Sequence, residues 1–245
     1  MSKITLIIVF LACAALWLLT NPQPTPEPIK QPALTWTTFL PIRDVPENGI
    51  VGDVRSHNIN NVYDDPDPIT TVHESTHGAN SILRNKHGCP AFYCLNNKAI
   101  LIQEPTTTLS AVAEIVPPSL RGKVYDTYLI DAQHDWQDHP SYILDEFIAY
   151  TQGGLARKEL GIQDRYEEVC FGMEFIVYSV CVARASGSDD QLREFLRWNI
   201  ERILNLQEGP SEYLNKLRMS EDAESLRSVM RRYFGATWTK RVFGW

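Results

Sequence analysis

Prolines at alternate positions separate the first part of the chain from the rest. Residues 21–33 contain five prolines, namely Pro22, Pro24, Pro26, Pro28 and Pro32. A proline inside a helix removes a hydrogen bond and clashes with the preceding turn, so this stretch cannot become helical. It favours extended polyproline geometry, which acts as a semi-rigid spacer. We therefore expect residues 21–33 to be a linker and residues 34–245 to form the folded domain.

The residues before this linker form an apolar run. Ile4 to Leu19 is apolar except for Thr5, and Lys3 precedes it. At about 1.5 Å per residue, the run with its flanks approaches the roughly 30 Å hydrocarbon core of a bilayer. We expect residues 1–20 to be an uncleaved N-terminal transmembrane anchor, with a cleaved signal sequence as the alternative. Either interpretation places the domain outside the cytoplasm, membrane-anchored in the first case and secreted in the second.

Composition limits the partners of this domain. The chain has 245 residues and a formal net charge of -7, which is enough length for one domain with a sizeable core. An acidic chain without a basic face does not neutralise phosphates, so we expect no nucleic-acid partner. The sequence leaves the oligomeric state open.

Hydrophobic periodicity predicts an α+β domain that is mostly helical. Asp67-Pro68 is typical of an N-cap followed by proline at the first helical position, and it predicts a helix from Ile69 to about Arg84. Two apolar runs around Asn96-Asn97 predict a small antiparallel β-hairpin over Ala91–Gln103. Residues 34–63 indicate loops with a strand or two. Further helices are expected at 109–116, 124–132, 141–160, 165–185, 188–206 and 221–233.

Four cysteines follow the one in the apolar run. Outside the cytoplasm the close pair Cys89 and Cys94 can form a small disulfide loop, which we expect in preference to two free thiols. Cys170 and Cys181 lie in one expected helix, too far apart along it to bridge each other. We expect both of them in the core.

The predicted helix at Ile69 carries His73-Glu74-Ser75-Thr76-His77, which matches the pattern H-E-x-x-H. Residues four apart share one helix face, so both imidazoles can reach one ion. Glu74, rotated by about 100°, lies beside that ion and can take a proton from an activated water molecule. The motif predicts a Zn²⁺ site with ligands His73 and His77 and with Glu74 as general base. A helix with solvated or hydrogen-bonded histidines is the alternative.

A hydrolytic zinc site needs a third protein ligand and an open fourth position. The segment 142–150 places the acidic pair Asp145-Glu146 in an otherwise apolar helix, where a carboxylate is costly unless paired or metal-bound. Glu146 is therefore our candidate for the third metal ligand, and a position on the helix surface is the alternative. His87, beyond the expected end of the first helix, is a weaker candidate.

Together, H-E-x-x-H on one helix and Glu146-Phe147-Ile148-Ala149 on a later one resemble the gluzincin metallopeptidases. The likeness is greatest to their lethal-factor-like branch, whose third-ligand helix has a similar Glu-Phe-x-Ala run. It covers only these two short motifs. The resemblance implies a zincin-like fold in which His73, His77 and Glu146 bind zinc and Glu74 is the general base. At Tyr150 the chain departs from that branch, which often has a second acidic residue there.

Zinc peptidases often add a tyrosine or histidine that stabilises the oxyanion of the tetrahedral intermediate. Candidates in this chain are Tyr128, His134, His139, Tyr142 and Tyr150. We rank His139, just before the third-ligand helix, and Tyr142, at its start, first among these candidates, with an ordinary loop or helix-start role as the alternative for both. Asp145 either orients a ligand histidine or is solvated.

These residues predict a zinc-dependent metalloendopeptidase that cleaves peptide or protein substrates outside the cytoplasm. The expected hairpin can offer an edge to an extended peptide, with plain structural pairing as the alternative. Two other functions stay open. One is a zinc hydrolase of a non-peptide amide in the cell envelope, which the same ligands and base would serve. The other is a non-catalytic, membrane-anchored envelope protein in which the motif is inert.

Overall fold

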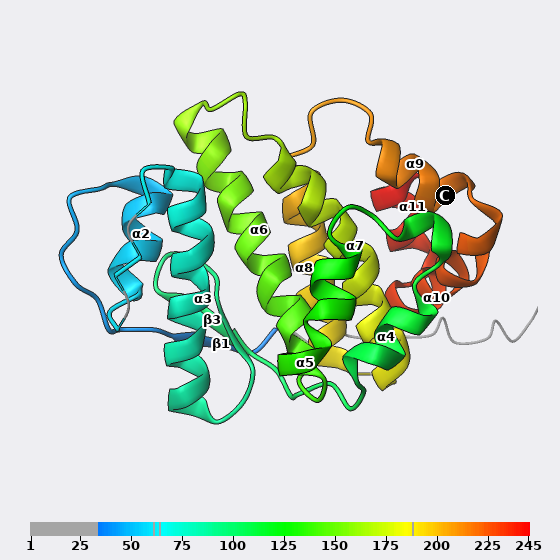
Figure 1. Cartoon of the computed structure of the whole chain (residues 1–245), viewed down its shortest axis with the longest axis horizontal. Coiled ribbons are helices and arrows are strands. Elements are labelled where there is room, and N and C mark those ends of the chain that lie inside the picture. Colours follow the sequence, from blue (N-terminus) through cyan, green and yellow to red (C-terminus); the bar gives the residue numbers. More distant parts are fainter. Residues whose placement is uncertain (1–33, 61, 64, 188) are drawn as a thin grey trace, which may run out of the picture. The chain divides into compact units, whose positions relative to one another are not determined.

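A computed structural model of the chain describes residues 34–245, apart from residues 61, 64 and 188. The expected anchor (1–20) and linker (21–33) lie outside the described residues. The described part is mostly helical with one small antiparallel sheet, as Figure 1 shows. The predicted α+β class is therefore confirmed.

Three short strands form the sheet, in the spatial order β1-β3-β2. They are β1 (Trp36–Thr38), β2 (Ala91–Tyr93) and β3 (Lys98–Leu101). β2 and β3 form the predicted antiparallel hairpin, in which Phe92 lies opposite Ile100. The connecting turn places Asn96 and Asn97 in left-handed backbone, which asparagine adopts more readily than most residues.

The outer side of β2 is covered by helices. All three residues of the strand are buried. The Tyr93 N–H donates to Asn80 Oδ1 at 2.6 Å, and the Tyr93 carbonyl accepts from Gln152 Nε2 at 2.5 Å. Because these side chains already use the strand's outward-facing backbone groups, β2 cannot pair with an extended peptide. The expectation that the hairpin offers such an edge is wrong for β2.

Helix α3 (Pro68–His87) carries the H-E-x-x-H segment where the sequence predicts a helix. The carboxylate of Asp67 accepts hydrogen bonds from the backbone N–H groups of Ile69 and Thr70, as an N-cap does. The helix ends at Gly88, which has the left-handed backbone of a C-terminal cap.

Helix α2 (Gly49–His57) occupies a segment for which the sequence indicates only loops and strands. It buries Val51 and Val54 against α3, and this packing outweighs the poor helix propensity of its two glycines. Gly78 of α3 permits the close approach of Asn58, the residue that follows α2. A Cβ added at Gly78 would lie 2.1 Å from Asn58 Oδ1.

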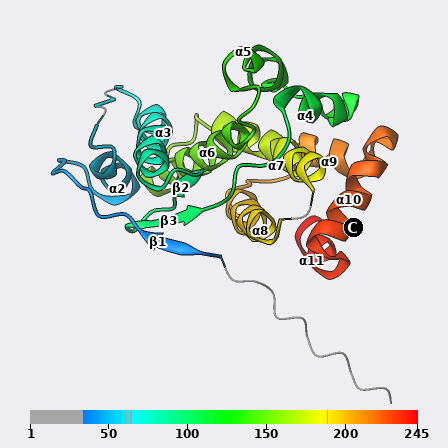
Figure 2. The same ribbon diagram turned by 90° about the horizontal axis from the view of Figure 1, so that it is seen from below.

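Three long helices form the middle of the domain: α6 (Ser141–Leu160), α7 (Glu167–Ser186) and α8 (Asp190–Leu204). α6 lies between α3 on one side and α7 on the other (Figure 1). α8 packs against both α6 and α7. The view in Figure 2 places the sheet and α8 on one side of α6, and α4 (Leu109–Ile115) and α5 (Gln133–Trp136) on the other.

The remaining elements are shorter. They are η1 (Pro118–Leu120), η2 (Asp126–Asp131), α9 (Glu212–Met219), η3 (Glu221–Ala223), α10 (Glu224–Phe234) and α11 (Ala236–Phe243). The sequence predicts α4 and α10, but not α9 or α11. The helix expected at 124–132 contains a six-residue π-helical segment, η2, rather than a regular α-helix.

Helix α7 is long and apolar enough to cross a membrane, and it is the one such helix in the described ranges. However, 72% of its most apolar window is buried inside the domain, against α6 and α8 among others. The apolar side chains of α7 thus belong to the core of the domain.

Buried apolar residues form two clusters. The larger includes the core side chains of α4, α6, α7, α8 and α10, and the smaller joins α2, α3 and the sheet. Ile69 and Val72, beside the first histidine of the motif, belong to the smaller cluster. Ile143 and Phe147, beside Glu146, belong to the larger. The residues of the motif and Glu146 therefore meet where the two clusters adjoin.

The cysteines differ from expectation at three positions. Cys89 and Cys94 are free, so the expected disulfide is wrong. Cys94 is buried, its Sγ donates to the Phe92 carbonyl, and burial raises the pKa of its thiol to about 12. Cys181 is buried as predicted, whereas Cys170 is exposed.

Candidate metal centre

Three side chains from two helices converge between α3 and α6. His73 and His77 lie one turn apart on α3, and Glu146 lies in the second turn of α6. The Nε2 atom of His73 is 3.4 Å from Glu146 Oε2, and the Nε2 atom of His77 is 3.6 Å from Glu146 Oε1. One donor atom from each of the three residues lies within 4.8 Å of the others, so the group can hold a metal ion.

The distances between these donors match the geometry of a metal site. Four ligands arranged tetrahedrally at about 2.0–2.1 Å from an ion lie about 3.3 Å from one another. Glu146 Oε2 is buried and accepts no hydrogen bond within the part of the chain that the structure describes. A buried oxygen without a partner is costly, and a cation between the three side chains would satisfy it.

Each imidazole also has a carboxylate behind it. The Nδ1 atom of His77 is 3.1 Å from Asp145 Oδ1, and the Nδ1 atom of His73 is 3.6 Å from Glu168 Oε2. A carboxylate at Nδ1 keeps the proton on that nitrogen and leaves Nε2 free to bind a metal. Asp145 is within hydrogen-bond distance of His77 Nδ1, whereas Glu168 is at ion-pair distance from His73 Nδ1. Both rings direct Nε2 toward Glu146.

Asp145 is the centre of a buried hydrogen-bond network. Its Oδ1 accepts from Asn80 Nδ2 at 2.6 Å as well as contacting His77, and its Oδ2 accepts from Arg84 Nη1 at 2.7 Å. Of the two roles that the sequence left open for Asp145, the structure thus supports the orientation of a histidine. Because Asn80 also binds the Tyr93 backbone, the network ties the metal centre to β2.

Glu168 comes from the first turn of α7, and its role was not predicted from the sequence. Its Oε1 is 3.6 Å from Arg165 Nη2, which leaves Oε2 directed toward His73. It passes close to Gly153 of α6, where an added Cβ would lie 3.0 Å from Glu168 Oε2. Helical spacing could have indicated that Glu168 faces the core, because it shares a helix face with Gly172 and Phe175, both buried.

Opposite charges dominate the electrostatics of the centre. Burial alone would raise the pKa of Glu146, but the charge of His77 and the contacts with both imidazoles outweigh it and hold the pKa at about 2. Burial opposes protonation of His77, yet Asp145 and Glu146 hold its pKa well above the usual value. Burial likewise opposes protonation of His73, and Glu146 and Glu168 raise its pKa. Without a metal, the site therefore favours protonated imidazoles beside an ionised Glu146.

Glu74 lies next to the ligand group without belonging to it. It is half-buried, and its negative charge adds to burial in raising the pKa values of Tyr63 and Tyr128. Its carboxylate is therefore near the loop before α3 on one side and near η2 on the other. Glu74 is not one of the three residues whose donor atoms lie within 4.8 Å of one another.

Three tyrosines, namely Tyr128, Tyr142 and Tyr150, lie near the candidate metal centre. Tyr150 packs edge-on against His73, with ring centroids 4.5 Å apart, and its hydroxyl is 2.8 Å from that of Tyr128. Tyr142 packs near Tyr128 and stacks on Trp136. Burial and the charge of Glu146 raise the pKa of Tyr142, so its hydroxyl stays protonated near the ligand group.

The two preferred oxyanion donors are placed differently. Tyr142 lies near Glu146, whereas His139 is exposed and lines a separate hollow with Arg84, Trp136 and Ser141. His134 is also exposed, and it pairs with Asp135. Tyr128, which the sequence ranked lower, also lies near the centre, because its hydroxyl is 2.8 Å from that of Tyr150, whose ring packs against His73. Comparison with models of protein families, with curated proteins and with solved structures gives no match to this chain.

Proposed function

We propose that this chain is a zinc-dependent metalloendopeptidase. The proposal rests on the approach of His73 Nε2 and His77 Nε2 to the two oxygens of Glu146, with a carboxylate behind each ring. Zinc favours imidazole nitrogen and carboxylate oxygen as ligands. Three protein ligands leave a fourth position for water or substrate, as in catalytic rather than structural zinc sites.

When bound, zinc would polarise the carbonyl of the scissile amide and lower the pKa of a water molecule. Glu74 would accept a proton from that water and return it to the nitrogen of the leaving amine. Asp145 would hold the Nδ1 proton of His77 in place, and the negative charge of Glu168 would favour a proton on Nδ1 of His73. Each of these side chains is half-buried or buried, which limits competing contacts with bulk water.

Tyr128 is our candidate for the donor that stabilises the oxyanion. Its side chain is half-buried, and the one hydrogen bond found for its hydroxyl among the described residues joins it to Tyr150. Burial first, and then the charges of the nearby carboxylates, raise its pKa, so the hydroxyl keeps its proton at neutral pH. Donors of this kind stabilise charge that develops only in the transition state. Tyr142 is the second candidate.

The location of this activity follows from the N-terminal sequence. An anchor at residues 1–20 and a proline-rich spacer at 21–33 would hold the domain at the outer face of a membrane. A peptide or protein within reach of that tether is then the substrate class.

The experiment uses the full chain in detergent, loaded with zinc, and a mixture of unstructured peptides. Wild type should cleave peptides, whereas Glu74→Gln should retain zinc and lose activity by about 10²–10⁴-fold. Glu114→Gln, an exposed glutamate on α4, is the matched control and should remain active. A wild-type protein that holds zinc and cleaves no peptide would contradict the proposal. Hydrolysis of non-peptide amides by that protein would instead support the cell-envelope amide hydrolase.

A further inference from the structure

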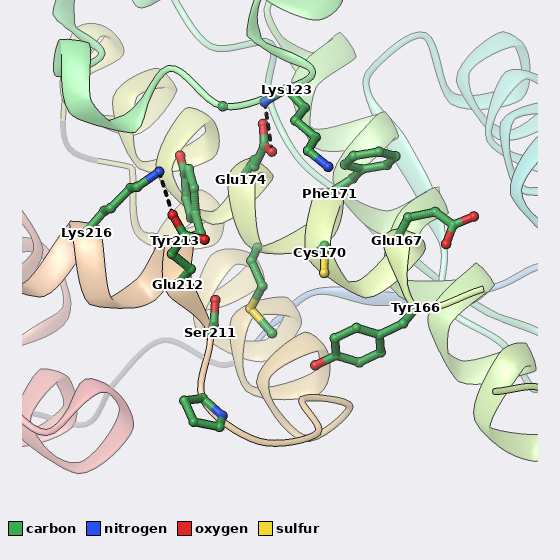
Figure 3. Close-up of a pocket in the computed structure, with 13 residues that line it drawn as sticks. Lys123, Tyr166, Glu167, Cys170, Phe171, Glu174, Ser211, Glu212, Tyr213 and Lys216 are labelled. Atoms are coloured by element: carbon green, nitrogen blue, oxygen red, sulfur yellow. Dashed lines mark hydrogen bonds and ion pairs between the residues drawn. The ribbon is translucent and has the colours of Figure 1, made fainter. Parts of the chain in front are cut away.

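A hollow of about 460 Å³ lies beside α7 on the side that faces α9. Figure 3 shows aromatic and sulfur-containing side chains around it, among them Tyr166, Cys170, Phe171 and Tyr213. This volume is within the range of small-molecule and side-chain binding sites, which are mostly apolar. We call it the α7–α9 hollow.

The α7–α9 hollow adjoins the metal centre through two aromatic rings. Phe171, which forms part of its wall, packs edge-on against Tyr150 with ring centroids 5.9 Å apart. Tyr150 in turn packs against His73 at 4.5 Å. Phe171 therefore lies within about 10 Å of the His73 ring, a span that an extended peptide covers in about three residues at roughly 3.4 Å each.

Hydrogen bonds hold the walls of the hollow in place. The buried carboxylate of Glu174 accepts from the backbone N–H of Lys123 (Figure 3) and also from that of Val124. The hydroxyl of Tyr213 donates to the Leu120 carbonyl at 2.8 Å. The hydroxyl of Tyr166 accepts from the backbone N–H of Glu208 at 2.8 Å. The hollow is therefore formed before any ligand binds, which lowers the cost of binding.

The charges at its rim are mostly neutralised. Lys216 pairs with Glu212 at 3.0 Å, and Glu167 pairs with Arg165 at 2.9 Å. Glu174 is already satisfied by backbone groups and by the Tyr178 hydroxyl. Lys123 is exposed at the rim, and its positive charge would disfavour a positively charged ligand side chain. The hollow thus offers a largely apolar surface, and the one buried carboxylate in its lining, Glu174, already has its hydrogen-bond partners.

We infer that the α7–α9 hollow is a substrate subsite that takes a bulky apolar side chain about three residues from the scissile bond. This inference rests on the proposed peptidase function. The same surface would otherwise receive an apolar small molecule, which the experiment below distinguishes.

The first test fills the hollow. Cys170 is exposed on its wall and takes no part in the metal centre, so Cys170→Trp narrows the space, while Cys170→Ser is the matched control. Zinc-loaded full chain in detergent is given peptides that differ only in having Phe, Leu, Ala or Lys at one position. We expect wild type and Cys170→Ser to prefer Phe and Leu over Ala by at least about tenfold in kcat/KM. Cys170→Trp should lose that preference and keep its rate on the Ala peptide.

The second test does not depend on catalysis. In the metal-free protein, alkylation of the Cys170 thiol by iodoacetamide is followed by mass spectrometry of the peptide that contains it. The Phe and Leu peptides should slow alkylation several-fold, and the Ala and Lys peptides should not. The thiol of Cys89, half-buried at other hollows, is the internal control and should react at one rate throughout.

The outcomes separate the two proposals. Cleavage without apolar preference, or with a preference that Cys170→Trp leaves intact, would overturn the subsite while the peptidase stands. Protection of Cys170 by Phe peptides without any cleavage would contradict the peptidase. Protection by free aromatic molecules such as indole but by no peptide would overturn the subsite, because the hollow would then serve small ligands.

Discussion

Glu168 Oε2 lies 3.6 Å from His73 Nδ1, while Glu146 lies at the opposite nitrogen of the same ring. Like Glu146 Oε2, this oxygen is buried and accepts no hydrogen bond among the described residues. Arg165 links the arrangement to the start of α3, because its guanidinium contacts both Glu168 and the N-cap residue Asp67. The first turn of α7 thus supports the helix that carries the metal ligands.

Removing the negative charge behind His73 should weaken metal binding. Loss of such an outer carboxylate typically costs 10–100-fold in metal affinity, and we expect an effect of about that size for Glu168→Gln. Zinc affinity is measured by competition with a chromophoric chelator. Glu167→Gln, an exposed neighbour in the same helical turn, is the control and should change affinity little. Equal affinities for wild type and Glu168→Gln would show that Glu168 does not position His73.

Asp145 should matter for stability as well as for the metal. Asp145→Ala leaves Arg84, Asn80 and His77 without their shared partner, and breaking a buried ion pair of this kind costs about 3 kcal/mol or more. The free energy of unfolding in urea, measured on metal-free protein, tests this. Asp131→Ala, at an exposed position, should change it by less than about 0.5 kcal/mol. A similar, small loss for both variants would mean that the network contributes little.

The pKa shifts fix the sign of the pH dependence. His77 has a folded-state pKa well above its ordinary value of 6.5, so in the metal-free protein its stabilising contribution is complete below about pH 6.5 and is lost as pH rises through the folded pKa. Glu146 has a folded pKa of about 2 against an ordinary 4.5, so its contribution is present above 4.5 and is lost as pH falls toward 2.

We expect zinc to reverse this trend if it binds as proposed, because coordination requires deprotonated imidazoles. We expect the rise in Tm on adding zinc to increase as pH rises from 6.5 through the folded pKa of His77, which lies well above that value. Scanning calorimetry with and without a chelator measures it. In Glu146→Gln the dependence should flatten, since one of the charges that raise the histidine pKa is gone. A zinc-induced shift that is independent of pH, or largest at low pH, would refute the assignment of the two imidazoles as ligands.

Gly78→Ala tests the packing of α3 against Asn58. An alanine in the middle of a helix ordinarily stabilises it by about 1 kcal/mol relative to glycine. Here the added Cβ would meet the Asn58 amide at 2.1 Å, and we expect overpacking to cost about 1–3 kcal/mol instead. In the background of Asn58→Ala the same substitution should be neutral or stabilising. The free energy of unfolding in urea is measured for wild type, Gly78→Ala, Asn58→Ala and the double variant. Additive effects of the two substitutions would show that the two positions do not interact.

The sequence was most informative where local chemistry and burial agree. The Asp67 cap and the proline after it predict the start of α3, and the structure has both in their expected roles. The end of the helix was predicted too early, at about Arg84, because α3 continues through His87 to a cap at Gly88. Glu146 could be singled out because a carboxylate in an apolar helix needs a partner.

Other features depend on contacts that a linear pattern does not contain. Glu168 looks like an ordinary acid in the first turn of a helix, where it would favour the helix dipole. His139 is near Glu146 in sequence, but it lies exposed in the segment before α6, whereas Glu146 is buried on that helix. The expected Cys89–Cys94 bridge fails because Cys94 faces into the protein from the end of β2.

The most direct test is to locate the metal. Anomalous diffraction at the zinc absorption edge, from crystals grown with zinc, should show one strong peak between α3 and α6. The peak should lie about 2.0–2.2 Å from the Nε2 atoms of His73 and His77 and from an oxygen of Glu146. Absence of a peak there at full zinc saturation, or a peak that binds other side chains instead, would contradict the central claim.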